Sequence, residues 1–361
     1  MSAADPLAPL RPDVLNDLPA VSASRVAGVL GDHPSLYSRS PVMWNAAFAA
    51  LGVPAVYLPF DVAPARVDAF LAACRAAPAL LGFSVTVPYK ERVLAQLDGV
   101  DTDAEAIGAV NTVLRTPEGK LLGTNTDGAA ARAVLRRFVG ASSAGDQSRS
   151  LLLLGAGGAA RAVGVAVARG MAAATILLCN RRPERAAETA RIIRQAGGEV
   201  TVVRPDELDT VLAGVDSVVN ASSVGMAGPV RTDDRVTWLE PFSPLAPADP
   251  PRIRPLQAAG ALPPVEWWPR AWPGIARNLE VSLRRTLRLR PGAVVLDLIY
   301  APLETVLLKH ARWTGHAAVN GLDVLVEQAV DAFMRVSRPL LQDGEPDPRP
   351  AIGRAMHAVL R

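Results

Sequence analysis

Short apolar runs alternate with amphipathic segments along most of the chain, and each run ends in polar or glycine-rich residues. An apolar run bounded by turn residues is typical of a buried strand, and apolar positions three and four apart are typical of a helix. Strands are expected at Arg25–Leu30, Ala55–Phe60, Leu80–Val87, Leu151–Leu154, Thr175–Cys179, Glu199–Val203, Asp216–Asn220 and Ala293–Tyr300. The main intervening helices are expected at Pro41–Gly52, Val67–Ala76, Glu91–Leu97, Gly128–Phe138, Pro183–Gln195, Asp206–Leu212 and Asn320–Val336. This alternation predicts an α/β fold.

The length of 361 residues suggests about two domains. A Gly/Ser/Ala-rich stretch at 141–150 marks the expected linker. We expect a substrate-binding α/β domain at 20–128, completed by C-terminal helices at 315–361, and a doubly wound Rossmann-like domain at 129–314. A hairpin is expected from Ile107–Leu114 and Leu121–Gly123.

The alternating pattern breaks at about 227–291, where proline, arginine and four tryptophans gather. Within this insert, Gly274–Leu287 has apolar residues at helical spacing with arginines elsewhere, which predicts an amphipathic basic helix. A long irregular segment is usually functional or disordered. Its role as a lid, a dimer contact or a partner site stays open at this point.

The net charge of +3 is too small to indicate a nucleic-acid partner. Cys74 and Cys179 lie far apart in apolar surroundings, which favours reduced core thiols and a cytoplasmic protein. We expect a loose tail at Met1–Pro19, which resembles neither a signal peptide nor a membrane span, and a C-terminal tail from Leu340 with a short helix.

Lys90 follows a strand that breaks at Pro88, and it is one of only three lysines in a chain with 38 lysines and arginines. An ammonium group can give up its proton, whereas a guanidinium stays charged. Lys90 is therefore a candidate for proton transfer, and the alternative is a solvated residue at a helix start. Asp127 either caps the helix that it opens or pairs with Lys90.

Two hydroxyls, Ser38 and Ser40, precede a helix with Pro41 at its first position. Ser40 is expected to be the N-cap, and the pair could bind a carboxylate, because a helix N-terminus favours an anion. Asn111 is a polar group in an apolar strand, so its amide is either bonded internally or faces a ligand.

The run Leu151–Leu154 leads directly into Gly155-Ala156-Gly157-Gly158-Ala159. A strand, a glycine-rich turn and a helix in this order bind the pyrophosphate of a dinucleotide. The next strand ends in Asn180-Arg181-Arg182, where an NAD site usually has an acidic residue. Two arginines suit a 2′-phosphate, so the sequence predicts NADP; the alternative is solvated arginines at a helix start.

Taken together, the motifs resemble the shikimate dehydrogenase family from about Arg25 to Val336, apart from the insert. The ordered motifs are Ser38-Arg39-Ser40-Pro41, Gly82–Lys90, Gly108–Thr112, Asn125–Gly128, Gly155–Ala159, Asn180–Arg182, Asp297–Tyr300 and Gly321–Gln328. The resemblance implies NADP-dependent, reversible reduction of 3-dehydroshikimate to shikimate, in the pathway to the aromatic amino acids. It implies a small-molecule substrate and no metal, nucleic acid or membrane partner, in a monomer or homodimer.

The resemblance also implies residue roles. Lys90 and Asp127 would form the catalytic pair, and Ser38 and Ser40 would hold the substrate carboxylate. Ring hydroxyls would bind Thr86, Asn111, Asp127 and Gln328, although Gln328 could instead be plain helix surface, and Tyr300 would help to position the substrate. The expected cofactor-binding residues are Gly155, Ala156, Gly157, Gly158, Ala159, Asn180, Arg181, Arg182, Ser222, Leu298 and Gly321.

The chain departs from the family pattern at several positions. Many members have Asn where Ser84 stands and His where Tyr37 stands, and the usual Gly-Leu-Gly-Met is here Gly321-Leu322-Asp323-Val324. These departures keep two alternatives open. One is a paralogue that oxidises quinate or an aminated analogue, and the other is a regulatory binder that has lost the chemistry.

Overall fold

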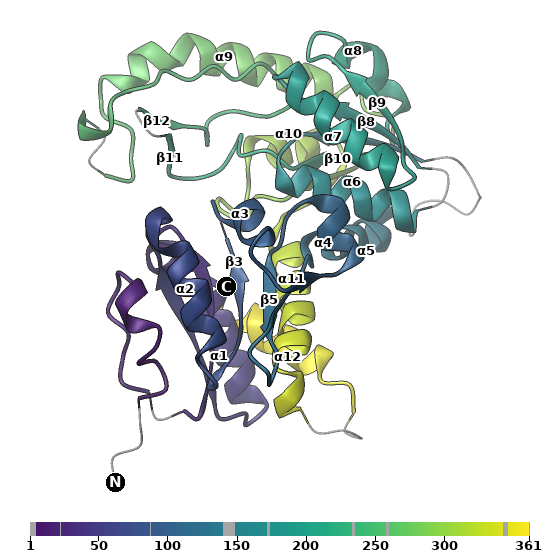
Figure 1. Cartoon of the computed structure of the whole chain (residues 1–361). Helices are drawn as coiled ribbons and strands as arrows, with labels where there is room; N and C mark the ends of the chain where they lie inside the picture. Colours follow the sequence, from purple (N-terminus) through teal and green to yellow (C-terminus); the bar gives the residue numbers. More distant parts are fainter. Residues whose placement is uncertain are drawn as a thin grey trace. The chain divides into compact units, whose positions relative to one another are not determined.

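The computed structural model describes residues 5–21, 23–86, 88–139, 149–171, 174–232, 235–257, 260–341 and 346–360. Most of the expected linker at 141–150, and Val87 at the end of one expected strand, lie outside the described residues. The chain forms two compact units, which are described separately (Figure 1). Unit 1 comprises Met1–Asp127 and Val326–Arg361, and unit 2 comprises Gly128–Leu325.

Unit 1 is built on a mixed six-stranded sheet. Its strands are β1 (Arg25–Gly31), β2 (Ala55–Asp61), β3 (Leu80–Val85), β4 (Gly99–Val100), β5 (Thr112–Arg115) and β6 (Leu121–Thr124), in the order β2-β1-β3-β5-β6-β4. The first three strands are parallel, β5 pairs antiparallel with β3, and β5 and β6 form an antiparallel hairpin. All six residues after Arg25 in β1 are apolar or glycine, and all six are buried, as expected for a strand covered on both faces.

The helices of unit 1 are α1 (Ser40–Ala50), α2 (Val67–Arg75), α3 (Lys90–Leu94), α4 (Thr102–Ile107), α11 (Leu322–Val336), which begins in unit 2, and α12 (Arg349–Ala358). Trp44 of α1 stacks on Tyr57 of β2 and lies 5.1 Å from the ring of Phe333 in α11. These rings join the two chain segments of unit 1, which explains how residues after 326 complete a fold begun by the N-terminal half.

The N-terminal segment is not the loose tail that the sequence suggested. Leu7 and Leu10 are fully buried in the core of unit 1. The backbone N–H of Leu15 donates to the carbonyl of Asp61 at the end of β2. One of the prolines that suggested a loose tail, Pro12, lies within a short 3₁₀ turn (Arg11–Asp13), and the buried leucines on either side of this turn, Leu10 and Leu18, hold the segment.

Unit 2 contains an all-parallel sheet. Its strands are β7 (Ser150–Leu154), β8 (Thr175–Cys179), β9 (Glu199–Val203), β10 (Ser217–Asn220), β13 (Val294–Asp297) and β14 (Ala317–Val319), in the order β14-β13-β10-β7-β8-β9. Its helices are α5 (Asp127–Val139), α6 (Gly158–Gly170), α7 (Pro183–Gln195), α8 (Leu208–Val211), α9 (Trp267–Thr286) and α10 (Val306–Trp313), with α5 beginning at the last residue of unit 1. The strand order reverses between β7 and β10, which is the dinucleotide-binding point of a Rossmann fold.

Two boundaries expected from the sequence, one in each unit, differ from those of the structure. The β13–β14 ladder places residues 317–319 in unit 2, whereas the sequence assigned 315–361 to the first domain. β14 is too short to stand out as an apolar run, and its pairing with β13 is a long-range property. Asn111 lies outside any strand, because α4 and the left-handed Gly108 precede it where the sequence suggested a strand from Ile107.

The insert forms a hairpin, β11 (Pro229–Thr232) with β12 (Arg235–Trp238), followed by an extended segment and the long helix α9, the long green helix in Figure 1. The helix begins at Trp267, seven residues before the expected start, and it contains Pro273. Trp267 and Ala271 are buried. Their burial offsets the backbone hydrogen bond that the proline removes.

Candidate active site

Lys90 and Asp127 form an ion pair in unit 1. Lys90 is the first residue of α3, directly after the turn that closes β3, and Asp127 is the first residue of α5. The distance from Lys90 Nζ to Asp127 Oδ2 is 2.6 Å, and the side chains are 30% and 25% exposed. Lys90 therefore has a carboxylate partner and is not a plain solvated residue at a helix start.

Asn111 holds the second oxygen of Asp127. Its Nδ2 donates to Asp127 Oδ1 at 2.8 Å and to Thr126 Oγ1 at 2.9 Å, while its Oδ1 accepts from the Thr126 N–H at 2.9 Å. The side chain is 4% exposed, so the amide is bonded internally and also touches the acidic member of the pair. The carboxylate of Asp127 is thereby fixed on both oxygens.

Asp127 does not act as a cap for its own helix. Its backbone N–H donates to Asn125 Oδ1 at 3.1 Å, so Asn125 satisfies this free donor of α5. Gln328, which the sequence left open as helix surface, lies beside the same network. Its Oε1 is 3.4 Å from Asn111 Nδ2, and Thr126 Oγ1 donates to its backbone carbonyl at 3.2 Å.

The serine pair departs from the expected capping pattern. Ser40 is the first residue of α1, Arg39 is the N-cap, and the Oγ of Ser38 accepts from the Ser40 N–H at 3.3 Å. Ser38 therefore takes the capping contact that was expected of Ser40, while both hydroxyls stay at this N-terminus. Thr86 follows β3 directly, and its N–H donates to the carbonyl of Leu30.

Tyr57 is a polar residue of this region to which the sequence interpretation gave no role. Its hydroxyl donates to Ser84 Oγ at 2.8 Å and also contacts Ser40. Burial raises the pKa of Tyr57 well above its ordinary value, so the phenol stays protonated and keeps its role as a donor. The only sequence signal was a hydroxyl-bearing ring in an otherwise apolar strand.

The glycine-rich turn of unit 2 has an open cradle. Gly155 follows β7 with φ of +115°, and a Cβ at this position would lie 2.9 Å from the carbonyl oxygen of Ala221. Gly157 is the N-cap of α6 without a side-chain cap, and a Cβ on Gly157 or Gly158 would meet no atom within 4 Å. Free N–H groups beneath open space at a helix N-terminus fit a pyrophosphate. Ala159 continues α6, and Ala156 accepts a bond from Thr189.

The end of β8 presents arginines and no acidic side chain. Asn180 Nδ2 donates to the carbonyl of Arg182, which is the N-cap of α7. Arg181 Nη1 donates to the carbonyl of Ala248 at 2.7 Å, which uses one of its donors and leaves others for a ligand. This donor set fits a 2′-phosphate and lacks the carboxylate that would bind a free ribose hydroxyl.

A buried amide and a buried carboxyl fix the loops after β10 and β13. Asn220 Nδ2 donates to Asp297 Oδ1 at 2.9 Å, and Asn220 Oδ1 accepts from the Ser222 hydroxyl at 2.7 Å. Burial raises the pKa of Asp297 to about 6. Leu298 and Tyr300 follow β13 in unit 2. A Cβ on Gly321 would lie 2.2 Å from the Leu298 carbonyl oxygen. The sequence indicated no role for Asn220 and Asp297.

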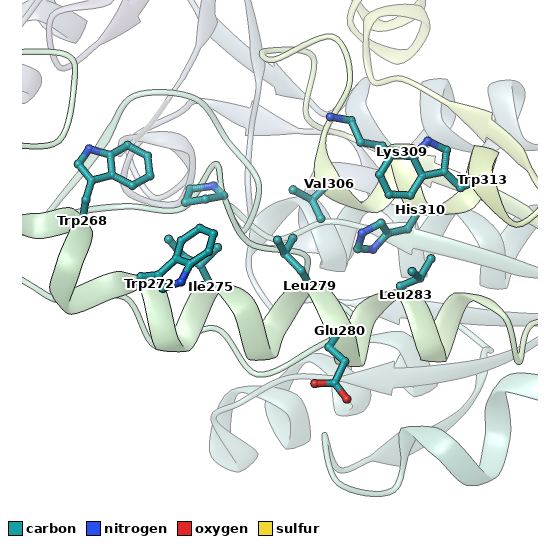
Figure 2. A pocket seen from close by; sticks show the side chains of 11 residues that line it. Trp268, Trp272, Ile275, Leu279, Glu280, Leu283, Val306, Lys309, His310 and Trp313 are labelled. Atoms are coloured by element: carbon teal, nitrogen blue, oxygen red, sulfur yellow. The ribbon is translucent and has the colours of Figure 1, made fainter.

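A separate groove lies between α9 and α10 (Figure 2). It encloses about 470 Å³, and its walls are mainly apolar, with exposed Trp272 and Trp313 at its edge. His310, one of the lining residues, shares a hydrogen bond with Ser282, and burial lowers the pKa of His310. The groove lacks the converging polar groups of a reaction site, and an exposed apolar surface of this kind is typical of a contact surface.

Among the described residues, no group of three or more His, Cys, Asp or Glu side chains gathers as metal ligands would. Cys74 and Cys179 are both buried, unpaired thiols. In the same described part of the chain, no helix is both long and apolar enough to cross a membrane.

A Rossmann-type unit with a phosphate-binding turn, together with a second unit that carries a lysine–carboxylate pair, defines the class of two-unit dinucleotide-dependent oxidoreductases. A family model described as the shikimate dehydrogenase substrate binding domain matches residues 29–113. The chain belongs to the shikimate dehydrogenase family, since curated relatives match it at more than 30% identity over most of its length.

Two such relatives are named shikimate dehydrogenase (NADP(+)). The protein of Methanocaldococcus jannaschii is 34% identical over 316 residues, covering 86% of this chain and 90% of the relative. That of Symbiobacterium thermophilum is 37% identical over 314 residues, covering 86% and 87%.

Solved structures agree with this assignment. A shikimate 5-dehydrogenase from Thermus thermophilus in complex with NADP(H) and shikimate has a TM-score of 0.63 and 27% identity, covering 92% of this chain and 99% of its own. A quinate dehydrogenase from Corynebacterium glutamicum in complex with NAD has a TM-score of 0.66 and 26% identity, covering 92% and 99%.

Proposed function

We propose that the protein is an NADP-dependent shikimate dehydrogenase, which reversibly reduces 3-dehydroshikimate to shikimate in the pathway to the aromatic amino acids. The family assignment and the names of its relatives support the reaction. The observation that carries the proposal is the Lys90–Asp127 pair, held on its second carboxylate oxygen by Asn111. An ammonium group that is oriented and partly exposed is suited to general acid catalysis at a ketone oxygen.

The chemistry divides between a hydride and a proton. NADPH, when bound, would supply the hydride that forms the new C–H bond at the ketone carbon. As negative charge develops on the carbonyl oxygen, Lys90 Nζ donates a proton to it, and the product is the secondary alcohol. Asp127 keeps the amine directed at this oxygen, and in the reverse direction the neutral amine of Lys90 takes the hydroxyl proton.

The remaining residues of unit 1 bind and orient the substrate. Ser38 and Ser40 hold the carboxylate at the start of α1, where the helix dipole favours an anion. Thr86, Asn111, Asp127 and Gln328 bind the ring hydroxyls. In unit 2, Tyr300 helps to position the substrate.

We assign substrate binding to unit 1 and NADP binding to unit 2. The turn Gly155–Ala159 would hold the pyrophosphate, and Asn180, Arg181 and Arg182 would hold the adenosine end with its 2′-phosphate. Ser222, Leu298 and Gly321 would line the nicotinamide end. The two buried thiols fit a reducing compartment, so we place the enzyme in the cytoplasm, as a monomer or a homodimer.

A panel of shikimate and quinate, each with NADP⁺ and NAD⁺, tests the proposal with the purified full chain. We expect absorbance of reduced nicotinamide to grow fastest with shikimate and NADP⁺. Turnover of quinate without turnover of shikimate would establish the paralogue. If no pair gives a rate while shikimate still binds in calorimetry, the protein is a binder that has lost the chemistry.

A further inference from the structure

The insert reaches the predicted adenosine end of the cofactor site through one contact. Arg181 donates from Nη1 to the carbonyl oxygen of Ala248 at 2.7 Å. Ala248 belongs to an irregular segment, Ser243–Asp249, which we name the strap, and its side chain is only 3% exposed. Arginine has several rotatable bonds, so a fixed acceptor restricts the directions in which its remaining donors point.

The strap has no regular secondary structure of its own, and α9 holds it in shape. Asn278, which is fully buried, donates from Nδ2 to the carbonyls of Ser243 at 3.0 Å, Ala246 at 3.3 Å and Pro247 at 3.0 Å. Its Oδ1 accepts from the Ser243 N–H at 2.7 Å. One side chain therefore ties both ends of a turn whose next carbonyl is the one that Arg181 contacts.

A second side chain of α9 fixes the middle of the strap. Arg285 is 5% exposed and donates from Nη1 to the carbonyl of Leu245 at 2.8 Å. Its other donors reach the Asp209 carboxylate at 2.9 Å and the carbonyl of Pro205 at 3.0 Å. Arg285 thus links the strap to Pro205 and Asp209, in the same unit as the arginine motif.

We propose that the insert is a built part of coenzyme recognition: Asn278 is a positioning residue that, through the strap, holds Arg181 in the orientation that reads the 2′-phosphate of NADP. The inference rests on the proposed use of NADP. It assigns part of the preference for NADP over NAD to α9, a helix of the insert. A pre-ordered guanidinium loses less conformational freedom on binding, which strengthens each charge-assisted bond to phosphate.

Calorimetric titration of the full chain with adenosine 2′,5′-bisphosphate and with adenosine 5′-monophosphate tests this directly. The dissociation constant of the monophosphate divided by that of the bisphosphate reports recognition of the 2′-phosphate without any turnover. A larger ratio means stronger recognition. We expect Asn278→Ala to lower that ratio by about five- to tenfold, similar to the loss of one well-placed charged hydrogen bond. Arg181→Ala should lower it at least as much.

Ser282→Ala is the matched control. Ser282 is also fully buried on α9, about one turn from Asn278, but it bonds to His310 and not to the strap. We expect it to lower thermal stability and to leave the ratio unchanged. In the Arg181→Ala background, Asn278→Ala should have no further effect on the ratio, because the residue through which it acts is gone.

Each outcome separates the two proposals. No preference of the unmodified protein for the bisphosphate would refute the use of NADP. A preference that Arg181→Ala removes and Asn278→Ala leaves intact would refute the positioning role alone. If Asn278→Ala does not fold, Ala248→Gly replaces it, since glycine frees the strap backbone and keeps the carbonyl; an unchanged ratio in that variant contradicts the proposal.

Discussion

The proposed substrate site depends mainly on side chains, and the proposed cofactor site depends mainly on backbone groups. In unit 1, Lys90, Asp127 and Asn111 are bonded to one another by their side chains. In unit 2, the phosphate cradle consists of backbone N–H groups that have no side-chain cap, and an arginine is held by a carbonyl of the insert. A side-chain network fails when one member is removed, whereas a backbone cradle fails when a side chain is added.

Lys90→Ala is expected to give the largest effect. Removal of the ammonium removes the proton donor, so kcat/KM with shikimate should fall by about 10²–10⁴-fold. Steady-state kinetics measures this loss, and calorimetry should find shikimate affinity changed far less, because the carboxylate contacts remain. Lys90→Arg keeps the charge but not a transferable proton, and full activity in that variant would contradict the assigned role.

These two sites also differ in how far the sequence predicts them. Lys90, Asp127 and the Gly155–Ala159 turn are apparent because each follows a strong local signal, a strand break, a helix start or a glycine cluster. The strap is different. Asn278 lies in α9 and contacts Pro247 of the strap, and only the folded chain brings these two distant residues together.

The same distinction explains the other omissions. Tyr57 of β2 reaches Ser84 of β3 across the intervening strand β1, and Asn220 reaches Asp297 across a parallel ladder, so neither pair has a local pattern. The N-terminal leucines were misjudged because burial depends on the surface that they meet and not on their own spacing. Long-range packing overrode a proline-rich composition there.

Arg285→Ala tests how firmly α9 anchors the insert. The substitution leaves the Leu245 carbonyl and the Asp209 carboxylate without their partner, and we expect the free energy of unfolding to fall by about 2–3 kcal/mol. Denaturant titration measures it. Arg288→Ala is the control, because Arg288 reaches the same Asp209 from a side chain that is 52% exposed. An equal loss of unfolding free energy in both variants would show that the buried contact stabilises the fold no more than the exposed one.

The glycine turn offers a paired test of the backbone cradle. Gly155→Ala forces a side chain into a φ of +115° and against the Ala221 carbonyl, so the free energy of unfolding should fall by about 1–3 kcal/mol. Gly157→Ala meets open space, so its stability should be unchanged while its affinity for NADP⁺ falls. Thermal unfolding and calorimetry separate the two effects. Unimpaired NADP⁺ binding by Gly157→Ala would place the pyrophosphate elsewhere.

Asp297 predicts the smallest effect, a pH dependence of stability. Because its folded-state pKa is raised to about 6, the folded state holds the proton after the unfolded state has released it. The stabilisation is complete below the ordinary pKa of 3.8 and is lost as pH rises through about 6, so the free energy of unfolding should decline across that window.

The contribution of this carboxyl is on the order of 1 kcal/mol between pH 4 and 6. Asp297→Asn has no proton to release and can still bond to Thr305 and Asn220, so its unfolding free energy should lack this component of the slope. Denaturant titrations of both proteins at several pH values measure the difference. Parallel curves would mean that the buried carboxyl titrates normally, and that the loops after β10 and β13 depend on its hydrogen bonds alone.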